Sequence, residues 1–314
     1  MNLQTELAPR HKSGLLLRNP VLTASGTFGF GTEYAKIAEI QRLGAIICKG
    51  TTLYARSGNE QPRTLETASG MLNAIGLQNP GIRIVVERFA PLWANWQTPV
   101  LVNIAGNTIE EFVELAERLE GVAGVAGIEM NVSCPNVHRG GAVFGSSPEM
   151  VADVTAAVRR ATTLPLIVKL SPNAGDARPT AVAAAEAGAD AVSLINTITG
   201  MSINVRARRL SLGNGTGGLS GPALKPIALR MVYEVAAELR SSHPHVPIVG
   251  LGGISTTNDA LEFLMAGASA IQVGTINFVN PHAGVDIIEG IEAFLRAEGV
   301  EDVKEIVGAA LPPV

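Results

Sequence analysis

The sequence predicts an α/β fold in which eight strand–helix units close into a (β/α)8 TIM barrel. Short apolar runs that end in a polar residue or glycine recur eight times, and stretches with helical periodicity alternate with them. Strict alternation predicts a parallel sheet, and 314 residues somewhat exceed the roughly 250 typical of this barrel. The 34 glycines and 4% aromatic content also suit buried parallel strands packed by small side chains.

The predicted strands are PVLTASG from Pro20, GAIICKG from Gly44, PVLVNIAG from Pro99, GIEMNVSC from Gly127, PLIVKLS from Pro165, ADAVSLINT from Ala189, VPIVGLGG from Val246 and AIQVGT from Ala270. The predicted helices are residues 33–43, 79–95, 108–120, 148–161, 176–187, 222–241, 256–266 and a last one from about residue 283.

The additional length falls at both ends of the predicted barrel. Residues 1–19, with a turn at Lys12-Ser13-Gly14, predict an N-terminal hairpin that plugs the bottom. Residues 50–78, 133–147 and 197–221 follow strands, so these insertions belong to the C-terminal face, where barrels of this kind place their chemistry. Without a linker to divide the chain, we expect residues 1–314 to form a single domain, with the barrel over 20–314.

Composition and charge exclude several classes of function. A net charge of −4 gives no broad basic surface for nucleic acid or anionic membranes. The N-terminus lacks a signal-like apolar stretch, and no run of about 18 apolar residues occurs, so we expect a cytoplasmic protein. Cys48 and Cys134 are a poor disulfide candidate, and two thiols alone cannot ligate an iron–sulfur cluster.

Polar residues and glycines gather where the predicted strands end. They are Ser25, Lys49, Asn103, Asn131, Cys134, Lys169, Asn196, Thr197, Gly252, Gly253, Gly274 and Thr275. A lysine within an apolar strand is costly unless it meets an anion or an acceptor, so Lys49 and Lys169 are expected to face a ligand. A structural ion pair is the alternative for each lysine.

Glycines in the last two units predict a phosphate site. GLGGIS precedes the seventh helix and VGT follows the eighth strand, so both present backbone N–H groups. A lysine opposite a phosphate suits flavin mononucleotide, whose reduced ring carries negative charge near N1, and Lys169 is the candidate. The same parts could bind a sugar phosphate in an isomerase or synthase.

Cys134 is the candidate reactive thiol. It lies in NVSCPNVHRGGAVFG, on a polar, glycine-rich loop just past the fourth strand. Cys48 fits a buried small hydrophobe, because strand alternation turns it toward the helices if Lys49 points inward. His138 could help a lid to close, although the favoured interpretation is a solvated loop histidine.

Asparagines make up much of the remaining ring: Asn73, Asn103, Asn131, Asn136 and Asn196. Amides offer donors and acceptors, which match a planar imide such as a pyrimidine. No HExxH or comparable histidine cluster occurs, so no metal site is expected.

Together these motifs resemble the class 1 dihydroorotate dehydrogenases, and subgroup 1B throughout the chain. NVSCPNVHRGGAVFG resembles the catalytic loop, and MLNAIGLQNPG from Met71 resembles the substrate loop. The flavin-contact motifs are KGTT from Lys49, VKLSPN from Val168, INTITGM from Ile195, GGLSGPALKP from Gly217 and GLGGI from Gly250.

The resemblance implies one bound FMN and a set of residues that contact it. These are Ser25, Lys49, Gly50, Asn103, Asn131, Lys169, Ile195, Gly221, Gly252, Gly253, Gly274 and Thr275. It also implies a second set that contacts dihydroorotate. These are Lys49, Asn73, Ala74, Ile75, Gly76, Leu77, Asn131, Asn136, Asn196 and Thr197.

The implied activity is oxidation of dihydroorotate to orotate in pyrimidine biosynthesis. Cys134 would remove the C5 proton while the C6 hydride passes to flavin N5. In subgroup 1B a separate subunit carrying FAD and a [2Fe–2S] cluster passes the electrons to NAD⁺. The resemblance also suggests a homodimer of catalytic subunits within a heterotetramer.

Three other functions remain open from the sequence. A dihydropyrimidine dehydrogenase barrel has a similar loop, but uracil lacks the carboxylate that Lys49 would hold. A dihydrouridine synthase would need a basic face for tRNA, which an acidic chain does not offer. A non-catalytic flavin-binding scaffold is disfavoured, because it would not require Cys134, Lys49 and Lys169 at positions suited to chemistry.

Overall fold

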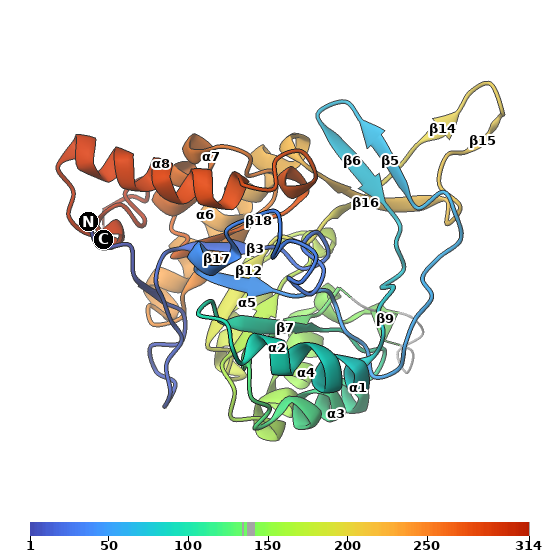
Figure 1. Ribbon diagram of the computed structural model, residues 1–314, viewed down its shortest axis with the longest axis horizontal. Helices are drawn as coiled ribbons and strands as arrows, with labels where there is room; N and C mark the ends of the chain where they lie inside the picture. The colour runs from blue at the N-terminus through green and yellow to red at the C-terminus, as the bar shows by residue number, and fades with distance from the viewer. Residues whose placement is uncertain (134, 137–141, 314) are drawn as a thin grey trace.

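The computed structural model describes residues 1–133, 135, 136 and 142–313, and a closed parallel barrel lies at its centre (Figure 1). Each barrel strand pairs with the next one along the chain, and the last pairs with the first. In order they are β3 (Val21–Thr23), β4 (Ala45–Ile47), β7 (Val100–Ile104), β8 (Val125–Asn131), β11 (Leu166–Lys169), β12 (Ala191–Leu194), β17 (Ile248–Leu251) and β18 (Ala270–Val273). All eight lie at the predicted apolar runs, so the predicted TIM barrel is confirmed.

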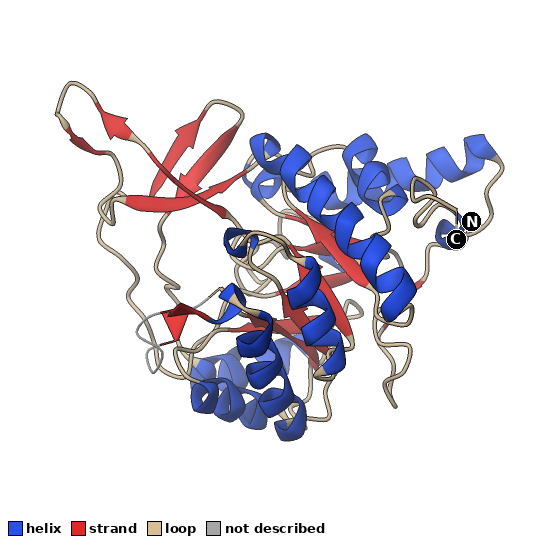
Figure 2. Ribbon diagram, turned by 180° about the vertical axis from the view of Figure 1, so that it is seen from behind, coloured by secondary structure: helices blue, strands red, loops and turns tan. Residues whose placement is uncertain are grey.

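Helices pack around the outside of the barrel (Figure 2). They are α1 (Ile82–Ile84), α2 (Ala90–Trp93), α3 (Ile109–Leu119), α4 (Pro148–Ala161), α5 (Arg178–Glu186), α6 (Lys225–Ser242), α7 (Thr257–Met265) and α8 (Ala283–Glu298). Side chains define several of their starts: Thr108 caps α3, Ser147 caps α4, and Thr256 with Asp259 forms a capping box for α7. Apolar faces such as that of Phe112 and Leu115 in α3 are fully buried against the strands.

The predicted helix over residues 33–43 is wrong. Only a 3-10 turn at Ile40–Arg42 forms there, after a series of separate turns. The ring of Tyr34 stacks on that of Phe28 at 4.0 Å between centroids, and its hydroxyl donates to the carbonyl of Thr27. Eleven residues give only a marginal helix, so tertiary contacts of this kind override the periodicity.

The predicted helix over residues 79–95 exists but is shorter and irregular. Between α1 and α2 the chain forms a π-helical turn at Val85–Phe89. Pro91 lies in the first turn of α2 and has no N–H, so the regular α-helical hydrogen-bond ladder cannot run through this position. The sequence pattern shows the helical period here but not this interruption.

The N-terminal hairpin closes the bottom of the barrel, as predicted. Strand β1 (Thr5–Glu6) pairs antiparallel with β2 (Leu16–Leu17). Leu7 and Leu17 pack with barrel-interior residues such as Ile47 and Ile167 in one buried cluster. The Thr5 hydroxyl donates to the carbonyl of Ser269 at 3.0 Å, which joins the hairpin to the start of β18.

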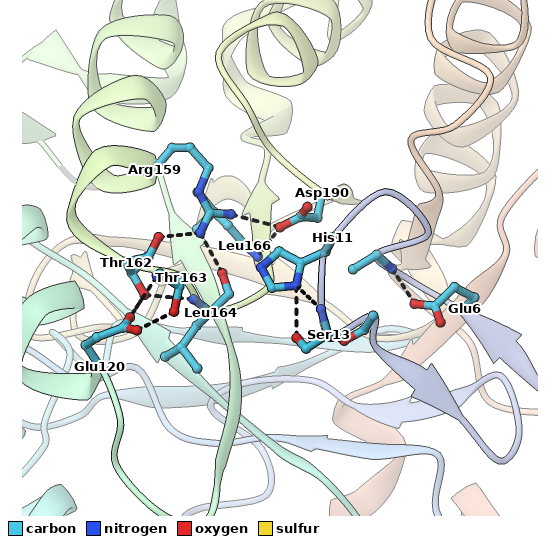
Figure 3. A network of polar contacts seen from close by, with 12 residues as sticks. Glu6, His11, Ser13, Glu120, Arg159, Thr162, Thr163, Leu164, Leu166 and Asp190 are labelled. Carbon is cyan, nitrogen blue, oxygen red and sulfur yellow. Dashed lines mark hydrogen bonds and ion pairs between the residues drawn. The ribbon is translucent and has the colours of Figure 1, made fainter.

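Polar contacts fix the loops that enter the strands at this same end (Figure 3). Arg159 pairs with Asp190 at 3.0 Å, and that carboxylate also accepts the backbone N–H of Leu166. The Glu120 carboxylate accepts hydrogen bonds from both Thr162 and Thr163. These residues precede strands, so they stabilise the end of the barrel opposite the expected site.

Two of the predicted insertions combine into one sheet beyond the C-terminal ends of the strands. The antiparallel order is β13 (Ile198–Met201), β16 (Thr216–Ser220), β6 (Gly70–Asn73) and β5 (Thr64–Thr67). A short hairpin of β14 (Ile203–Asn204) and β15 (Arg209–Leu210) extends from it, and the third insertion pairs β9 (Pro135–Asn136) with β10 (Ala142–Val143). Figure 1 shows the four-stranded sheet projecting from the barrel.

Candidate active site

A cavity of about 440 Å³ opens where the barrel strands end, partly covered by the antiparallel sheet. Every predicted cofactor residue lines it: Ser25, Lys49, Gly50, Asn103, Asn131, Lys169, Ile195, Gly221, Gly252, Gly253, Gly274 and Thr275. The predicted substrate residues Asn73, Ala74, Ile75, Gly76, Leu77, Asn196 and Thr197 line it too. Small-molecule pockets measure about 300–1,000 Å³, so the cavity is large enough for a cofactor.

Two predicted loop residues cannot be placed in this cavity. Cys134 and His138 lie outside the described residues. For Asn136 only the backbone is described, and it pairs with Ala142 in the β9–β10 ladder. Their roles therefore remain predictions.

Lys49 reaches the cavity from the end of β4 and has no acidic partner among the described residues. Burial lowers the pKa of its ammonium below the ordinary value, and the positive charge of Arg63 lowers it further. The negative charge of a bound anion would raise this pKa again. The interpretation of Lys49 as a ligand-facing cation, made from its place in an apolar strand, is consistent with this environment.

Lys169 lies at the end of β11 and combines the two roles considered for it. Its ammonium lies 3.6 Å from the carboxylate of Glu129 and 3.4 Å from the hydroxyl of Ser25. The lysine side chain is 5% exposed, yet it lines the cavity. The Lys169 ammonium thus forms the structural ion pair and also faces the cavity as a cation.

Two amides beside this ion pair turn their nitrogens toward the carboxylate. Asn103 donates from Nδ2 to Glu129 at 2.7 Å, and Gln272 donates from Nε2 to Glu129 at 2.6 Å. The Gln272 carbonyl oxygen is buried and has no hydrogen-bond partner within the described part of the chain. Both residues line the cavity, so each can accept an N–H of a ligand there.

A second pair of amides is oriented by internal hydrogen bonds. Asn196 donates from Nδ2 to both Asn131 and Ser133, at 3.1 and 3.0 Å, and accepts from the N–H of Thr197. Asn131 accepts through Oδ1, so its own N–H groups are directed elsewhere. Asn196 therefore retains only a lone pair of Oδ1 for a ligand, whereas Asn131 retains donors.

Backbone and small residues form the far end of the cavity, after β17 and β18. Gly252 and Gly253 adopt φ of 128° and 79°, a region that favours glycine. The Thr275 hydroxyl donates to that of Ser220 at 2.9 Å. Because these glycines carry no side chain of their own, a phosphate could approach their backbone closely, as the phosphate of FMN would require.

The sequence pattern did not single out Glu129 or Gln272, both of which are buried within barrel strands. The sequence does contain a signal for both residues, because each is a polar residue within an otherwise apolar strand. Glu129 lies in GIEMN and Gln272 lies in AIQVG. Ser133, Ser220 and Phe278 also line the cavity and were not predicted.

Cys48 is the buried cysteine that strand alternation predicts. It is 0% exposed and packs in the cluster between the strands and the helices. Burial raises the pKa of its thiol to about 12. In the described ranges there is no helix long and apolar enough to cross a membrane, and no grouping of three or more His, Cys, Asp or Glu side chains that could hold a metal.

Comparisons with known proteins agree with this geometry. The family model described as Dihydroorotate dehydrogenase matches residues 10–295. A relative from Geotalea uraniireducens is 53% identical over 299 residues, covering 95% of this chain and 96% of its own. A second, from Thermoanaerobacter pseudethanolicus, is 51% identical over 309 residues, covering 98% and 99%. Both are named "Dihydroorotate dehydrogenase B (NAD(+)), catalytic subunit".

Among solved structures, the fold is similar to that of DHODH from Eimeria tenella in complex with ferulenol. The TM-score is 0.79 at 22% identity, covering 99% of this chain and 89% of the other. This similarity supports the barrel fold, and the sequence relatives support the activity. The chain belongs to the dihydroorotate dehydrogenase family, oxidoreductases that oxidise dihydroorotate in pyrimidine biosynthesis.

Proposed function

We propose that this chain is the FMN-bearing catalytic subunit of an NAD⁺-type dihydroorotate dehydrogenase, with Cys134 as the catalytic base. The observation that carries the proposal is the cavity itself, in which Lys49, a cation without an acidic partner in the described ranges, faces the same space as the glycines after β17 and β18. A ligand with a phosphate and a second ligand with a carboxylate fit these two features. The names of the relatives support the NAD⁺ type and the role of a catalytic subunit.

FMN would be held by the cavity residues predicted to contact it, and when bound it would supply the hydride acceptor. The ammonium of Lys169 and the oxygens of Asn103 and Gln272 would meet its ring, because these three residues line the cavity side by side around Glu129. The backbone after β17 and β18 would hold its phosphate.

Dihydroorotate would lie against Lys49 and the stretch 73–77, whose residues reach the cavity from the antiparallel sheet. Lys49 would neutralise its carboxylate, and the donors of Asn131 would bind its ring carbonyls. Cys134 would take the C5 proton, a role that rests on the resemblance of its loop.

The chain would act as one domain, in the cytoplasm, without contact to nucleic acid or membrane. Electrons would pass to NAD⁺ through a partner subunit that carries FAD and a [2Fe–2S] cluster, within a heterotetramer built on a dimer of this chain. A partner is needed in this proposal because this chain has two cysteines, too few for the cluster.

The test is anaerobic reduction of the purified yellow protein by L-dihydroorotate, followed at the flavin band. Wild type should bleach rapidly, and Cys134→Ala should bleach far more slowly while keeping its FMN. NAD⁺ should not restore the colour until the partner is added. A yellow protein that dihydrouracil bleaches and dihydroorotate does not would refute the substrate, and a chain unable to bind FMN would refute the cofactor.

A further inference from the structure

A carboxylate lies buried directly beneath the cavity and does not line it. Glu129 is 0% exposed and stands on β8, opposite Asn103 of the neighbouring strand β7. A charged group here has no access to water, so its partners within the protein must compensate it.

Within the described part of the chain, the partners of Glu129 are a cation and three hydrogen-bond donors. One carboxylate oxygen accepts from Asn103 and lies 3.6 Å from the ammonium of Lys169. The other accepts from Ser193 at 3.0 Å and from Gln272 at 2.6 Å. Three of these four partners line the cavity, and Ser193 does not.

The carboxylate fixes which atoms of the two amides face the cavity. An ionised carboxylate only accepts, so Asn103 and Gln272 must turn their nitrogens toward it. Their oxygens then point away from the carboxylate. The oxygen of Asn103 lies beside Gly50, a residue that lines the cavity: a β-carbon added to Gly50 would come within 3.0 Å of it. The oxygen of Gln272 is buried and has no hydrogen-bond partner among the residues that the structure describes. Such a position is costly unless a ligand donates to the oxygen.

We propose that Glu129 is a positioning residue for the flavin: by holding Lys169, Asn103 and Gln272 it sets both the affinity for FMN and its reduction potential. This inference rests on the proposed function, since it concerns the cofactor of that site. The alternative is that Glu129 only neutralises a buried lysine and leaves the cofactor unaffected.

The two roles have different consequences for the cofactor. Glu129 and Lys169 form a neutral pair beneath the cavity, and the negative charge partly cancels the field of the ammonium. Removing the negative charge should stabilise the reduced flavin, which is more negative than the oxidised form. An amide at this position also no longer forces Asn103 and Gln272 to present their oxygens, so FMN should bind less tightly.

The experiment compares wild type with Glu129→Gln and Glu129→Asp in the FMN-loaded full chain. The readouts are the dissociation constant for FMN and the reduction potential, measured against a dye in equilibrium with the protein. Glu129→Gln should weaken FMN binding about tenfold and raise the ratio of reduced to oxidised flavin about tenfold at a fixed potential, which is roughly 30 mV for two electrons. Glu129→Asp keeps the charge but is shorter, so it should weaken binding and leave the potential near that of wild type.

Glu120→Gln is the matched control. Glu120 also accepts several hydrogen bonds, but at the opposite end of the barrel, so the same chemical change should move neither readout. A folded Glu129→Gln with wild-type affinity and potential would overturn the proposal. If Glu129→Gln does not fold, wild-type affinity in folded Glu129→Asp would overturn it instead. Wild type unable to bind FMN would overturn the proposed cofactor first, and this inference with it.

Discussion

Replacing Lys49 by Met should selectively weaken the binding of a carboxylate-bearing pyrimidine. Lys49 is the cavity cation without an acidic partner among the described residues, and Met has a similar length without the charge. A hydrogen bond to a charged group contributes about 1.5–3 kcal/mol, which corresponds to a loss of orotate affinity of about 13-fold to 160-fold.

The assay is calorimetric titration of the FMN-loaded protein with orotate and, separately, with uracil. Uracil has the same ring without the carboxylate, so Lys49→Met should leave its affinity within about threefold, as no charged partner is removed. Lys36→Met serves as the control, because Lys36 is an exposed lysine outside the cavity.

Equal losses for orotate and uracil would show that the substitution distorts the site and does not remove a carboxylate contact. Unchanged orotate affinity in Lys49→Met would refute the assignment of Lys49 as the carboxylate partner. In either case the FMN content of the variant must first match that of wild type.

Three further predictions concern protonation, thiol reactivity and the barrel floor. The pKa of Lys49 is lowered in the fold, so the protonated amine that attracts orotate is lost as the pH rises through that lowered value. Titrations at increasing pH should therefore show the orotate affinity of wild type falling at alkaline pH. Lys49→Met should show no such decline. Iodoacetamide should label at most one thiol of the native protein, Cys134, because Cys48 is buried with its pKa raised to about 12; mass spectrometry finding Cys48 modified before unfolding would contradict this. Leu17→Ala should reduce the free energy of unfolding in urea by about 2–5 kcal/mol, whereas Leu16→Ala, at a 58% exposed neighbour, should change it by less than about 0.5 kcal/mol.

The sequence predicted the barrel and most of its cavity because both depend on local patterns. Apolar runs define each strand, and the carboxyl ends of parallel strands converge on one face, so the order of the strands is enough to predict that residues such as Asn103 and Lys169 lie together. The helix expected over residues 33–43 failed because ring stacking between Phe28 and Tyr34 is a tertiary contact that periodicity does not encode.

Long-range pairing explains the other gaps. The insertion containing β6 pairs with the one containing β16, far away along the chain, and nothing in either segment alone indicates the other. Glu129 was overlooked for a related reason, since its importance comes from Asn103, Ser193 and Gln272, which lie on three other strands. A polar residue within a buried strand is the signal that could have identified it.

The hairpin that closes the barrel floor also affects how the chain can fold during synthesis. Its contact between Thr5 and Ser269 spans 264 positions, so the N-terminal strands cannot complete their contacts until nearly the last strands have been synthesised. Until β17 and β18 emerge from the ribosome, Leu7 and Leu17 have only part of their buried cluster to pack against. Contacts of such high sequence separation slow folding and leave apolar surface open to aggregation. We therefore expect barrel closure to be completed late, after translation of the final strand, with the N-terminal hairpin among the last elements to become protected from hydrogen exchange.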